Sequence, residues 1–427
     1  ALFLIAALFA LFAAGLWIGL GLLSCGWIAM ALFTARPVGD AMVTTIWGSA
    51  TSWTLTALPM FIWMGEILFR TKLSEDMFRG LAPWMSRIPG RLLHTNIIGC
   101  AIFAAVSGSS AATCATIGKM TIPELRARKY PEDMLIGTLA GAGTLGLLIP
   151  PSLIMIVYGV AADVSIAKLF MAGVIPGIIL AVLFMGYVGV WSLLNPGKIP
   201  QPTEKISFGQ KLWAARHLLP TVGLIIAVLG SIYAGIATAT EAAGLGVVGA
   251  LIIAAAQGTL NRKTFAESLM GATRLSCMIA LILCGSAFLT LAMGFTGLPR
   301  QLADWIDHLG LSAGALIVAL TVFYIVLGCF LDGISMVVLT MAVVLPMIER
   351  LHIDLIWFGV FVVLVVEMAQ ITPPVGFNLF VLQGMTGHQI TYIGRVAFPL
   401  FLLMCVAVAL MFFFPELATW LPAKMIG

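Results

Sequence analysis

Long apolar runs follow one another along most of the 427-residue chain. A helix needs about 20 consecutive apolar residues to cross a bilayer. The charge-free runs that approach or exceed this length are 1–35, 41–65, 134–162, 169–197, 217–240, 275–299, 368–394 and 396–415. The pattern predicts an all-α polytopic membrane protein, with two short crossings inside the first run and a third crossing from about Ile46 to Phe69.

Two of these runs are interrupted by glycines and a proline pair. The first interruption lies in Leu139–Ser152, around Pro150-Pro151, and the second in Glu367–Asn378, around Pro373-Pro374. Proline breaks the helical hydrogen-bond ladder. Inside a bilayer, the freed backbone groups are tolerated only where they are buried in protein or line a cavity. A matched pair of broken segments is the best pointer in a sequence to the binding site of a transporter.

The two interruptions belong to a longer internal repeat. Prolines 123, 150 and 176 recur as prolines 346, 373 and 399, at one constant offset of 223 residues. Each half also holds an apolar hairpin before its broken helix. The first hairpin, within 92–119, has Ser107-Gly-Ser-Ser110 at its tip, and the second, within 312–347, has Asp332-Gly-Ile-Ser335.

An odd number of crossings in each half predicts that the two halves have inverted topology. We expect five crossings and one re-entrant hairpin in each half, with the linker 195–216 on the cytoplasmic side. The four loops that this topology places inside hold 14 of the 22 Lys and Arg residues; they are 70–94, 123–133, 195–216 and 258–268. Cytoplasmic loops carry such an excess. One hairpin then enters from each face of the membrane.

Composition excludes several other classes of protein. The chain is 61% hydrophobic and 9% charged, against about 25% charged residues in soluble domains. Its net charge of +4 is spread over loops, so no nucleic-acid patch is expected. The seven cysteines lie in apolar segments without CxxC spacing and are interpreted as packing residues.

Six motifs together resemble the large membrane subunit of tripartite ATP-independent periplasmic (TRAP) transporters, and the likeness covers nearly the whole chain. They are PMFIWMGE at 59–66, SGSSAAT at 107–113, GTLGLLIPPS at 143–152, ATATEAAGLG at 237–246, GCFLDGISM at 328–336 and QITPPVGFNLFV at 370–381. One departure is Ala239, where the family pattern has proline.

The resemblance implies a sodium-coupled importer of organic acids in the bacterial inner membrane, without enzymatic activity and without a cofactor other than Na⁺ as coupling ion. It also implies two partners, a periplasmic substrate-binding protein and a small four-helix membrane subunit, and an elevator mechanism of the ion transporter superfamily type. The implied parts are scaffold helices 1–69 and 217–293, an amphipathic arm helix 70–91, a first transport half 92–194, the linker 195–216, and a second transport half 294–427.

Sodium is a hard cation that takes oxygen ligands, which hydroxyls, amides and unwound backbone carbonyls supply. For a first sodium site we expect Ser107, Ser109 and Ser110 with Gly143 and Gly146. For a second site we expect Asp332, Gly333, Ser335, Thr372, Gly376 and Asn378. The structural alternatives stay open: small residues also let helices pack closely, and Asp332 can cap a helix.

The substrate is expected between the two breaks, which contain no Lys or Arg. Helix N-termini and backbone amides would then supply the positive potential that an acid requires. The candidate contacts are Thr144, Pro150, Pro151, Ser152, Pro373, Pro374 and Asn378. Three glutamates also interrupt apolar runs: Glu367 is a candidate for coupling, whereas Glu66 and Glu241 are expected to pair with neighbouring helices.

Three rival functions remain at this point. A stand-alone sodium/carboxylate symporter would need no binding protein. An ATP-driven pump is disfavoured, because the sequence has no G-x-x-x-x-G-K-[ST] motif. An intramembrane serine protease, with a serine of the 107–110 motif as nucleophile and His94 or His217 as base, is disfavoured because a repeat of this kind has no evident use in an enzyme. The sequence does not identify the acid or the number of sodium ions.

Overall fold

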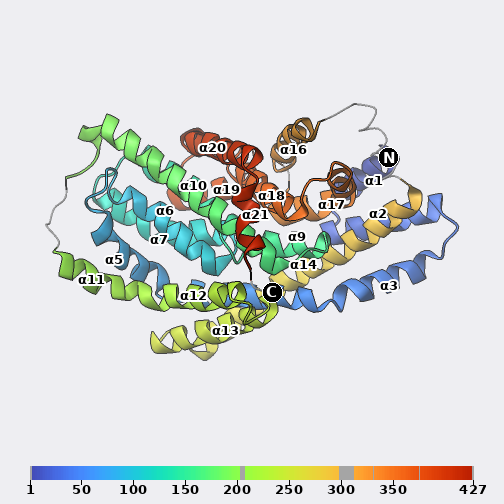
Figure 1. Cartoon of the computed structure of the whole chain (residues 1–427), viewed down its shortest axis with the longest axis horizontal. Coiled ribbons are helices and arrows are strands. Elements are labelled where there is room, and N and C mark those ends of the chain that lie inside the picture. Colours follow the sequence, from blue (N-terminus) through green and yellow to red (C-terminus); the bar gives the residue numbers. More distant parts are fainter. Residues whose placement is uncertain (1, 202–206, 298–311, 330, 375, 426–427) are drawn as a thin grey trace.

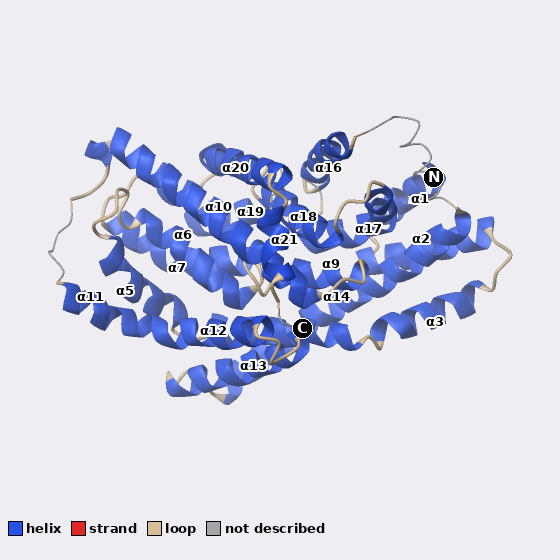
Figure 2. Ribbon diagram, in the orientation of Figure 1, coloured by secondary structure: helices blue, strands red, loops and turns tan. Residues whose placement is uncertain are grey.

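The computed structural model of the chain describes residues 2–201, 207–297, 312–329, 331–374 and 376–425 (Figure 1). Every regular element in those ranges is a helix, and none is a strand (Figure 2). The prediction of an all-α chain is confirmed for these residues. Parts of the predicted linker (202–206) and of the second transport half (298–311, 330, 375 and 426–427) lie outside them.

The helices of the first half follow the predicted order. They are α1 (Leu2–Ala13), α2 (Ile18–Phe33), α3 (Val38–Ala50), the 3-10 helix η1 (Trp53–Thr56), α4 (Ala57–Phe69), α5 (Leu73–Met85), α6 (Leu93–Ser107), α7 (Ser110–Ala127), α8 (Glu132–Leu148), α9 (Leu153–Ala161) and α10 (Ile166–Leu194).

The linker and the second half follow. Their helices are η2 (Pro196–Lys198), α11 (Phe208–Ala215), η3 (Arg216–Leu218), α12 (Leu219–Tyr233), α13 (Ala239–Ala256), α14 (Arg262–Thr296), α16 (Ala313–Leu327), α17 (Gly333–Arg350), α18 (Leu355–Gln370), α19 (Phe377–Thr386), α20 (Ile390–Phe413) and α21 (Glu416–Ala423).

The proline offset of 223 residues also relates the bounds of the helices. Moving α7 (110–127) along the chain by this offset gives 333–350, which are the bounds of α17. The broken pair α8 and α9 maps in the same way onto α18 and α19, to within two residues at each end. Each half therefore contains a hairpin, a broken helix and a long closing helix in the same order.

Two buried helices form the centre of the molecule. All side chains of α8 from Met134 to Leu148 are buried, and so are all those of α18 from Trp357 to Gln370. A helix that is apolar all round belongs inside a protein or a bilayer. The two helices pack against each other near the middle of the molecule (Figure 1). Each of them leads directly into one of the two breaks.

A second group of helices, around α14, exposes apolar side chains to the surroundings. The 35-residue α14 packs along α2, α3 and α4, and α4 packs against α13 (Figure 1). Six described helices are long and apolar enough to span a membrane, or eight if two bent pairs each count as one span. The exposed side chains of Trp47, Ile226 and Ile252 belong to this surface. Polytopic membrane character is thus confirmed.

The structure corrects four details of the predicted elements. The crossing from Ile46 to Phe69 is divided into α3 and α4, which are bent by 54° where Thr51 and Ser52 leave the helix. Helix α14 begins at Arg262, 13 residues before the charge-free run 275–299, because Asn261 and Thr264 form a capping box. The short helices α11 in the linker and α21 after Pro415 were not predicted.

Candidate functional site

The tip of the first hairpin is the turn between α6 and α7. Gly108 takes a left-handed conformation (φ +61°) that ends α6, and the Ser109 hydroxyl accepts a hydrogen bond from the Ala112 N–H at 3.4 Å, which caps α7. The hydroxyls of Ser107 and Thr113 lie 2.7 Å apart. Glycine followed by serine is the chemistry that such a turn needs, since glycine tolerates positive φ and serine caps helices.

The first break lies directly against this tip. Helix α8 ends at Leu148 and α9 starts at Leu153, with a bend of 40° and a cis bond between Pro150 and Pro151. The Ser152 hydroxyl caps α9 by accepting from the Met155 N–H at 3.2 Å. The Leu153 N–H donates to the Gly108 carbonyl at 3.4 Å. Pro150, Pro151 and Ser152 are buried, so the first break is enclosed within the protein beside the hairpin tip.

Glycines on α8 allow the hairpin to approach closely. A Cβ atom on Gly146 would lie 2.6 Å from both the Ser109 carbonyl oxygen and the Thr113 hydroxyl. A Cβ atom on Gly143 would lie 2.8 Å from the Cys114 Cβ. The structure thus brings Gly146 against the backbone carbonyl of Ser109, and also against the hydroxyl of Thr113, which was not among the expected residues. Ser110 is also buried there, whereas the Thr144 hydroxyl donates to the Gly141 carbonyl of its own helix at 2.8 Å.

The tip of the second hairpin uses a carboxylate in place of a hydroxyl. Asp332 caps α17 by accepting from the N–H groups of Ile334 and Ser335 at 3.2 and 3.3 Å, and the Ser335 hydroxyl also donates to it. This is the capping arrangement that the sequence left open. A Cβ atom on Gly333 would lie 2.6 Å from Val366 of α18 and 2.8 Å from Ile154 of α9. The second tip therefore packs between helices of both halves.

The second break is more open than the first. It runs from the end of α18 at Gln370 to the start of α19 at Phe377, and it contains the cis bond between Pro373 and Pro374. Both prolines are exposed. Gly376 precedes α19 at φ +33°, and a Cβ atom there would lie 2.9 Å from the Thr372 carbonyl oxygen. No side chain at the N-cap accepts a hydrogen bond from α19.

Asn378 joins the two groups of expected residues. It was placed with the second sodium group, but a Cβ atom on Gly143 of the first group would lie 3.3 Å from its Nδ2 atom. Its side chain is fully buried, and neither Nδ2 nor Oδ1 has a hydrogen-bond partner among the described residues. An orphaned amide inside a protein is rare. The structure therefore places Asn378, which was expected in the second sodium site, against Gly143 of the first.

Glu367 is a second orphaned polar group, on the fully buried helix α18. Its side chain is 0% exposed, and no hydrogen bond of normal geometry reaches either carboxylate oxygen in the part of the chain that the structure describes, although the carboxylate lies beside the backbone of Leu148 at the end of α8. It lies three residues before the end of α18 at Gln370. The sequence singled this residue out because it interrupts an apolar run, although it was not among the expected ion ligands.

The other glutamates in apolar runs have structural partners. Glu66 pairs with Arg70 one turn further along α4, and Arg70 also lies 3.9 Å from Glu267 of α14. Glu241 accepts from the Thr238 N–H and hydroxyl at 2.8 Å, within the capping box of α13. The expectation that Glu241 pairs with a neighbouring helix is therefore wrong, because its own N-terminus satisfies it.

The contacts of the serine motif do not form a nucleophile–base pair. The Ser107 hydroxyl bonds to Thr113. Within the described ranges, His94 contacts the Pro89 carbonyl at 2.6 Å and His217 lies 3.3 Å from Asp76 of the arm helix, so neither imidazole bonds to the serines at the tip. No cluster of three or more His, Cys, Asp or Glu side chains that could hold a metal occurs in those ranges either. The tip offers only neutral oxygen groups.

Comparison with known proteins agrees with this geometry. A family model described as "Tripartite ATP-independent periplasmic transporter, DctM component" matches residues 5–417. The C4-dicarboxylate TRAP transporter large permease protein DctM of Rhodobacter capsulatus is 31% identical, over 92% of this chain and 92% of that protein. The sialic acid TRAP transporter large permease protein SiaM of Vibrio cholerae is 27% identical, over 94% and 98%.

A solved structure supports the fold alone. The Alcanivorax borkumensis YdaH transporter superposes with a TM-score of 0.64 and 13% sequence identity, covering 94% of this chain and 96% of the other. The family match over most of the chain, together with the relative at 31% identity, decides the family. The chain belongs to the DctM components of tripartite ATP-independent periplasmic transporters, and is a large membrane subunit of that kind.

Proposed function

We propose that this subunit imports an organic acid in symport with sodium, together with a periplasmic substrate-binding protein and a small membrane subunit, in the bacterial inner membrane. The observation that carries the proposal is the junction of the two halves at Asn378. There, an unsatisfied buried amide of α19 lies against Gly143 of α8, on the helix that packs on the first hairpin tip. Unsatisfied polar atoms at such a place are what a transported ion or substrate would occupy.

Sodium fits the groups that the junction offers. Hard cations prefer oxygen ligands. The Asn378 Oδ1 atom, the hydroxyls of Ser107 and Ser109, and carbonyls of the broken α8 segment are neutral oxygens within one contiguous region. In the second region, Asp332 adds a negative charge beside Ser335. We assign the first sodium site to the first region, with Asn378 added, and a second site to Asp332, Gly333, Ser335, Thr372 and Gly376.

The substrate carboxylate is assigned to the second break. The start of α19 has no side-chain cap, so its N-terminal N–H groups are open to an anion, whereas Ser152 already caps α9. Anions bind at helix N-termini because N–H groups point outward there and the helix dipole favours negative charge. Pro373, Pro374 and Asn378 would line this end, with Pro150, Pro151, Ser152 and Thr144 behind them. The names of the relatives, for C4-dicarboxylates and sialic acid, fit acidic substrates of this class.

Transport is proposed to follow the elevator scheme. The hairpins and broken helices pack around α8 and α18 and would form the moving body, while α2, α3, α4, α13 and α14 would form the scaffold. The arm helix α5 would connect the two. In this scheme both breaks travel together, so the ion and the substrate cross the membrane as one unit.

The test is uptake of radiolabelled organic acids into proteoliposomes that hold this subunit and its small partner. Uptake is expected only with an inward sodium gradient and a purified binding protein present together. Uptake that needs sodium but no binding protein would instead establish the stand-alone sodium/carboxylate symporter. Equal uptake of every tested acid with and without a sodium gradient would overturn sodium coupling.

A further inference from the structure

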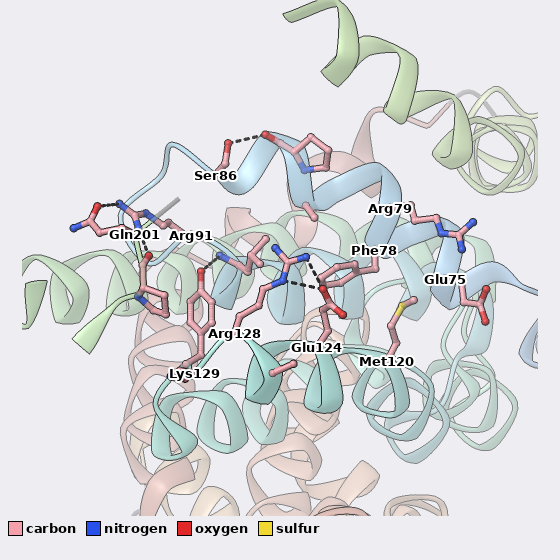
Figure 3. Close-up of a pocket in the computed structure, with 16 residues that line it drawn as sticks. Glu75, Phe78, Arg79, Ser86, Arg91, Met120, Glu124, Arg128, Lys129 and Gln201 are labelled. Carbon is pink, nitrogen blue, oxygen red and sulfur yellow. Dashed lines mark hydrogen bonds and ion pairs between the residues drawn. The ribbon is translucent and has the colours of Figure 1, made fainter. Parts of the chain in front are cut away.

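A cavity unrelated to the two breaks lies between the arm helix and the base of the first hairpin. It has a volume of about 1160 Å³ and is bounded by α5, by the end of α7 with the turn after it, and by the linker at Pro200 and Gln201 (Figure 3). The hairpin tip at 107–110 is at the opposite end of α7 from the lining residues Arg128 and Lys129. The transport mechanism proposed above makes no use of this cavity.

The cavity has an excess of positive charge. Its lining includes Arg79, Arg91, Arg128 and Lys129 against Glu75 and Glu124. Only Arg128 is paired with a carboxylate, through Nε to Glu124 Oε1 at 2.8 Å (Figure 3). No carboxylate among the described residues forms an ion pair with the other three cations.

Two of the three cations without a carboxylate partner have an unusual backbone conformation. Arg91 (φ +48°) and Lys129 (φ +60°) both adopt left-handed conformations that residues with side chains rarely take. For Lys129 this is the left-handed end of α7, since the Tyr130 N–H donates to the Leu125 carbonyl at 3.0 Å, and it sets where the side chain leaves the backbone. The Arg91 guanidinium donates to the carbonyl of Pro200 and to Gln201 Oε1, which are both neutral, so these bonds orient the charge without cancelling it (Figure 3).

Tyr130 also lines the cavity. Its hydroxyl accepts from the Leu92 N–H at 3.3 Å. Burial raises the pKa of this hydroxyl, while the nearby charges of Arg91 and Arg128 act in the opposite direction. Tyr130 and both arginines line the same cavity.

Apart from Ser86, Tyr130 and Gln201, the rest of the lining is apolar. Phe78, Ala82 and Pro83 come from α5, and Met120 and Ala127 come from α7. The opposite face of α5 is buried in the protein through Leu73, Met77, Leu81 and Met85. A free phosphate ion would use the cations alone, whereas a lipid would use the cations and the apolar wall together.

We propose that this cavity binds the phosphate headgroup of an anionic phospholipid of the cytoplasmic leaflet, with its acyl chains along Phe78 and Met120. Basic clusters on the cytoplasmic side attract anionic lipids, and the cavity is bounded by parts of three segments that the charge pattern predicts on that side, 70–94, 123–133 and 195–216. Arg79, Arg91 and Lys129 supply the uncompensated charge, and Arg128 lies beside them. The inference concerns binding alone and depends on neither sodium coupling nor movement of the hairpins.

The test is native mass spectrometry of the purified subunit with its small partner in detergent, with phosphatidylglycerol, phosphatidylcholine or inorganic phosphate added. The variant Arg79→Gln/Lys129→Gln removes two cations that have no carboxylate partner, so it leaves no unpaired charge. The matched control Arg262→Gln/Lys263→Gln removes two cations from another predicted cytoplasmic loop. Thermal unfolding of each variant checks that it is folded.

Wild type and control are expected to retain phosphatidylglycerol in preference to phosphatidylcholine. The cavity variant should retain about tenfold less, because each basic residue contributes to attraction near an anionic surface. Equal retention by the cavity variant and the control would overturn the proposal. Displacement of phosphatidylglycerol by millimolar inorganic phosphate would also overturn it, by showing a site for a soluble anion. If the cavity variant fails to fold, Lys129→Gln alone provides the comparison.

Discussion

The two helix breaks differ most in how their helix ends are satisfied. In the first, Ser152 caps α9, and the hairpin tip bonds to the break through Gly108 and Leu153. In the second, the position equivalent to Ser152 is Val375 by the offset of 223, and α19 starts without a side-chain cap. Both breaks carry a cis proline pair, but only the first is buried.

This difference suggests that the two related helix breaks have different roles in binding. The closed break holds the hairpin tip and fixes the geometry of the oxygens around Ser107 and Ser109. The open break leaves N–H groups of α19 for an anion, since a capping side chain would compete with a ligand for them. The following variants test this difference between the two breaks.

The largest effect is expected at the close contact behind the first tip. In Gly146→Ala the new methyl would lie 2.6 Å from the Ser109 carbonyl oxygen, which is backbone and cannot rotate away. Overpacking of this kind costs about 1–3 kcal/mol, and uptake should fall below detection. Gly186→Ala on α10 is the control, since open space surrounds it. Normal uptake and thermal stability in Gly146→Ala would show that the first break need not be closed.

Asn378→Ala should reduce transport without reducing stability. Both polar atoms of this buried amide are unpartnered, so its removal takes away an unsatisfied group. Asn96 is the matched control, because its amide donates to the Leu135 carbonyl and the Thr138 hydroxyl at 3.2 and 3.0 Å.

We expect Asn96→Ala to cost about 1–3 kcal/mol through the unpaired partners it leaves. Asn378→Ala should instead keep its stability and need about tenfold more sodium for half-maximal uptake, equivalent to about 1.4 kcal/mol. Urea titration and sodium titration of uptake measure the two quantities. A loss of stability in Asn378→Ala equal to that in Asn96→Ala would make the amide structural.

Ser152→Ala tests the cap of the first break. Loss of an N-cap hydroxyl costs about 0.5–2 kcal/mol, so the midpoint of unfolding should fall measurably. Thr372→Ala is the comparison in the second break, where the hydroxyl donates only to the Met368 carbonyl of its own helix at 2.7 Å. Its unfolding midpoint should hardly change. Equal losses in both variants would remove the contrast between a capped and an uncapped break.

The smallest change in stability is expected for Asp332→Asn. Asparagine caps helices about as well as aspartate, so the bonds to the Ile334 and Ser335 N–H groups should survive. Removal of the charge should raise the sodium concentration for half-maximal uptake a few-fold. Sodium activation identical to that of wild type would leave Asp332 as a helix cap and nothing more.

The repeat explains why much of the fold could be predicted from sequence. Proline and glycine act locally on the backbone, so their spacing predicted both hairpin turns and both breaks, and the offset of three proline pairs matches the bounds of α7 and α17. The bend between α3 and α4 was missed because no proline or glycine lies at Thr51-Ser52. Polar residues without proline or glycine are only a weak signal of a helix break within an apolar run.

The arrangement of the site was less predictable than its location. The contact of Asn378 with Gly143 joins segments more than two hundred residues apart, and the lateral packing of two halves leaves no periodic signal in one sequence. The difference in burial between the two proline pairs was hidden for the same reason. Glu367 could have been included among the expected ligands, since an ionisable residue in an apolar run is a functional candidate by default.

Sodium-dependent stabilisation tests the central claim without knowledge of the substrate. The measurement is thermal unfolding of the purified wild-type subunit with its small partner in NaCl and in KCl at equal ionic strength, alongside Asn378→Ala. A ligand that binds only the folded state raises stability with its concentration. We predict a rise of the unfolding temperature that is specific to sodium in wild type and weaker in Asn378→Ala. Identical curves in both salts for wild type would contradict a sodium site at the junction of the two breaks.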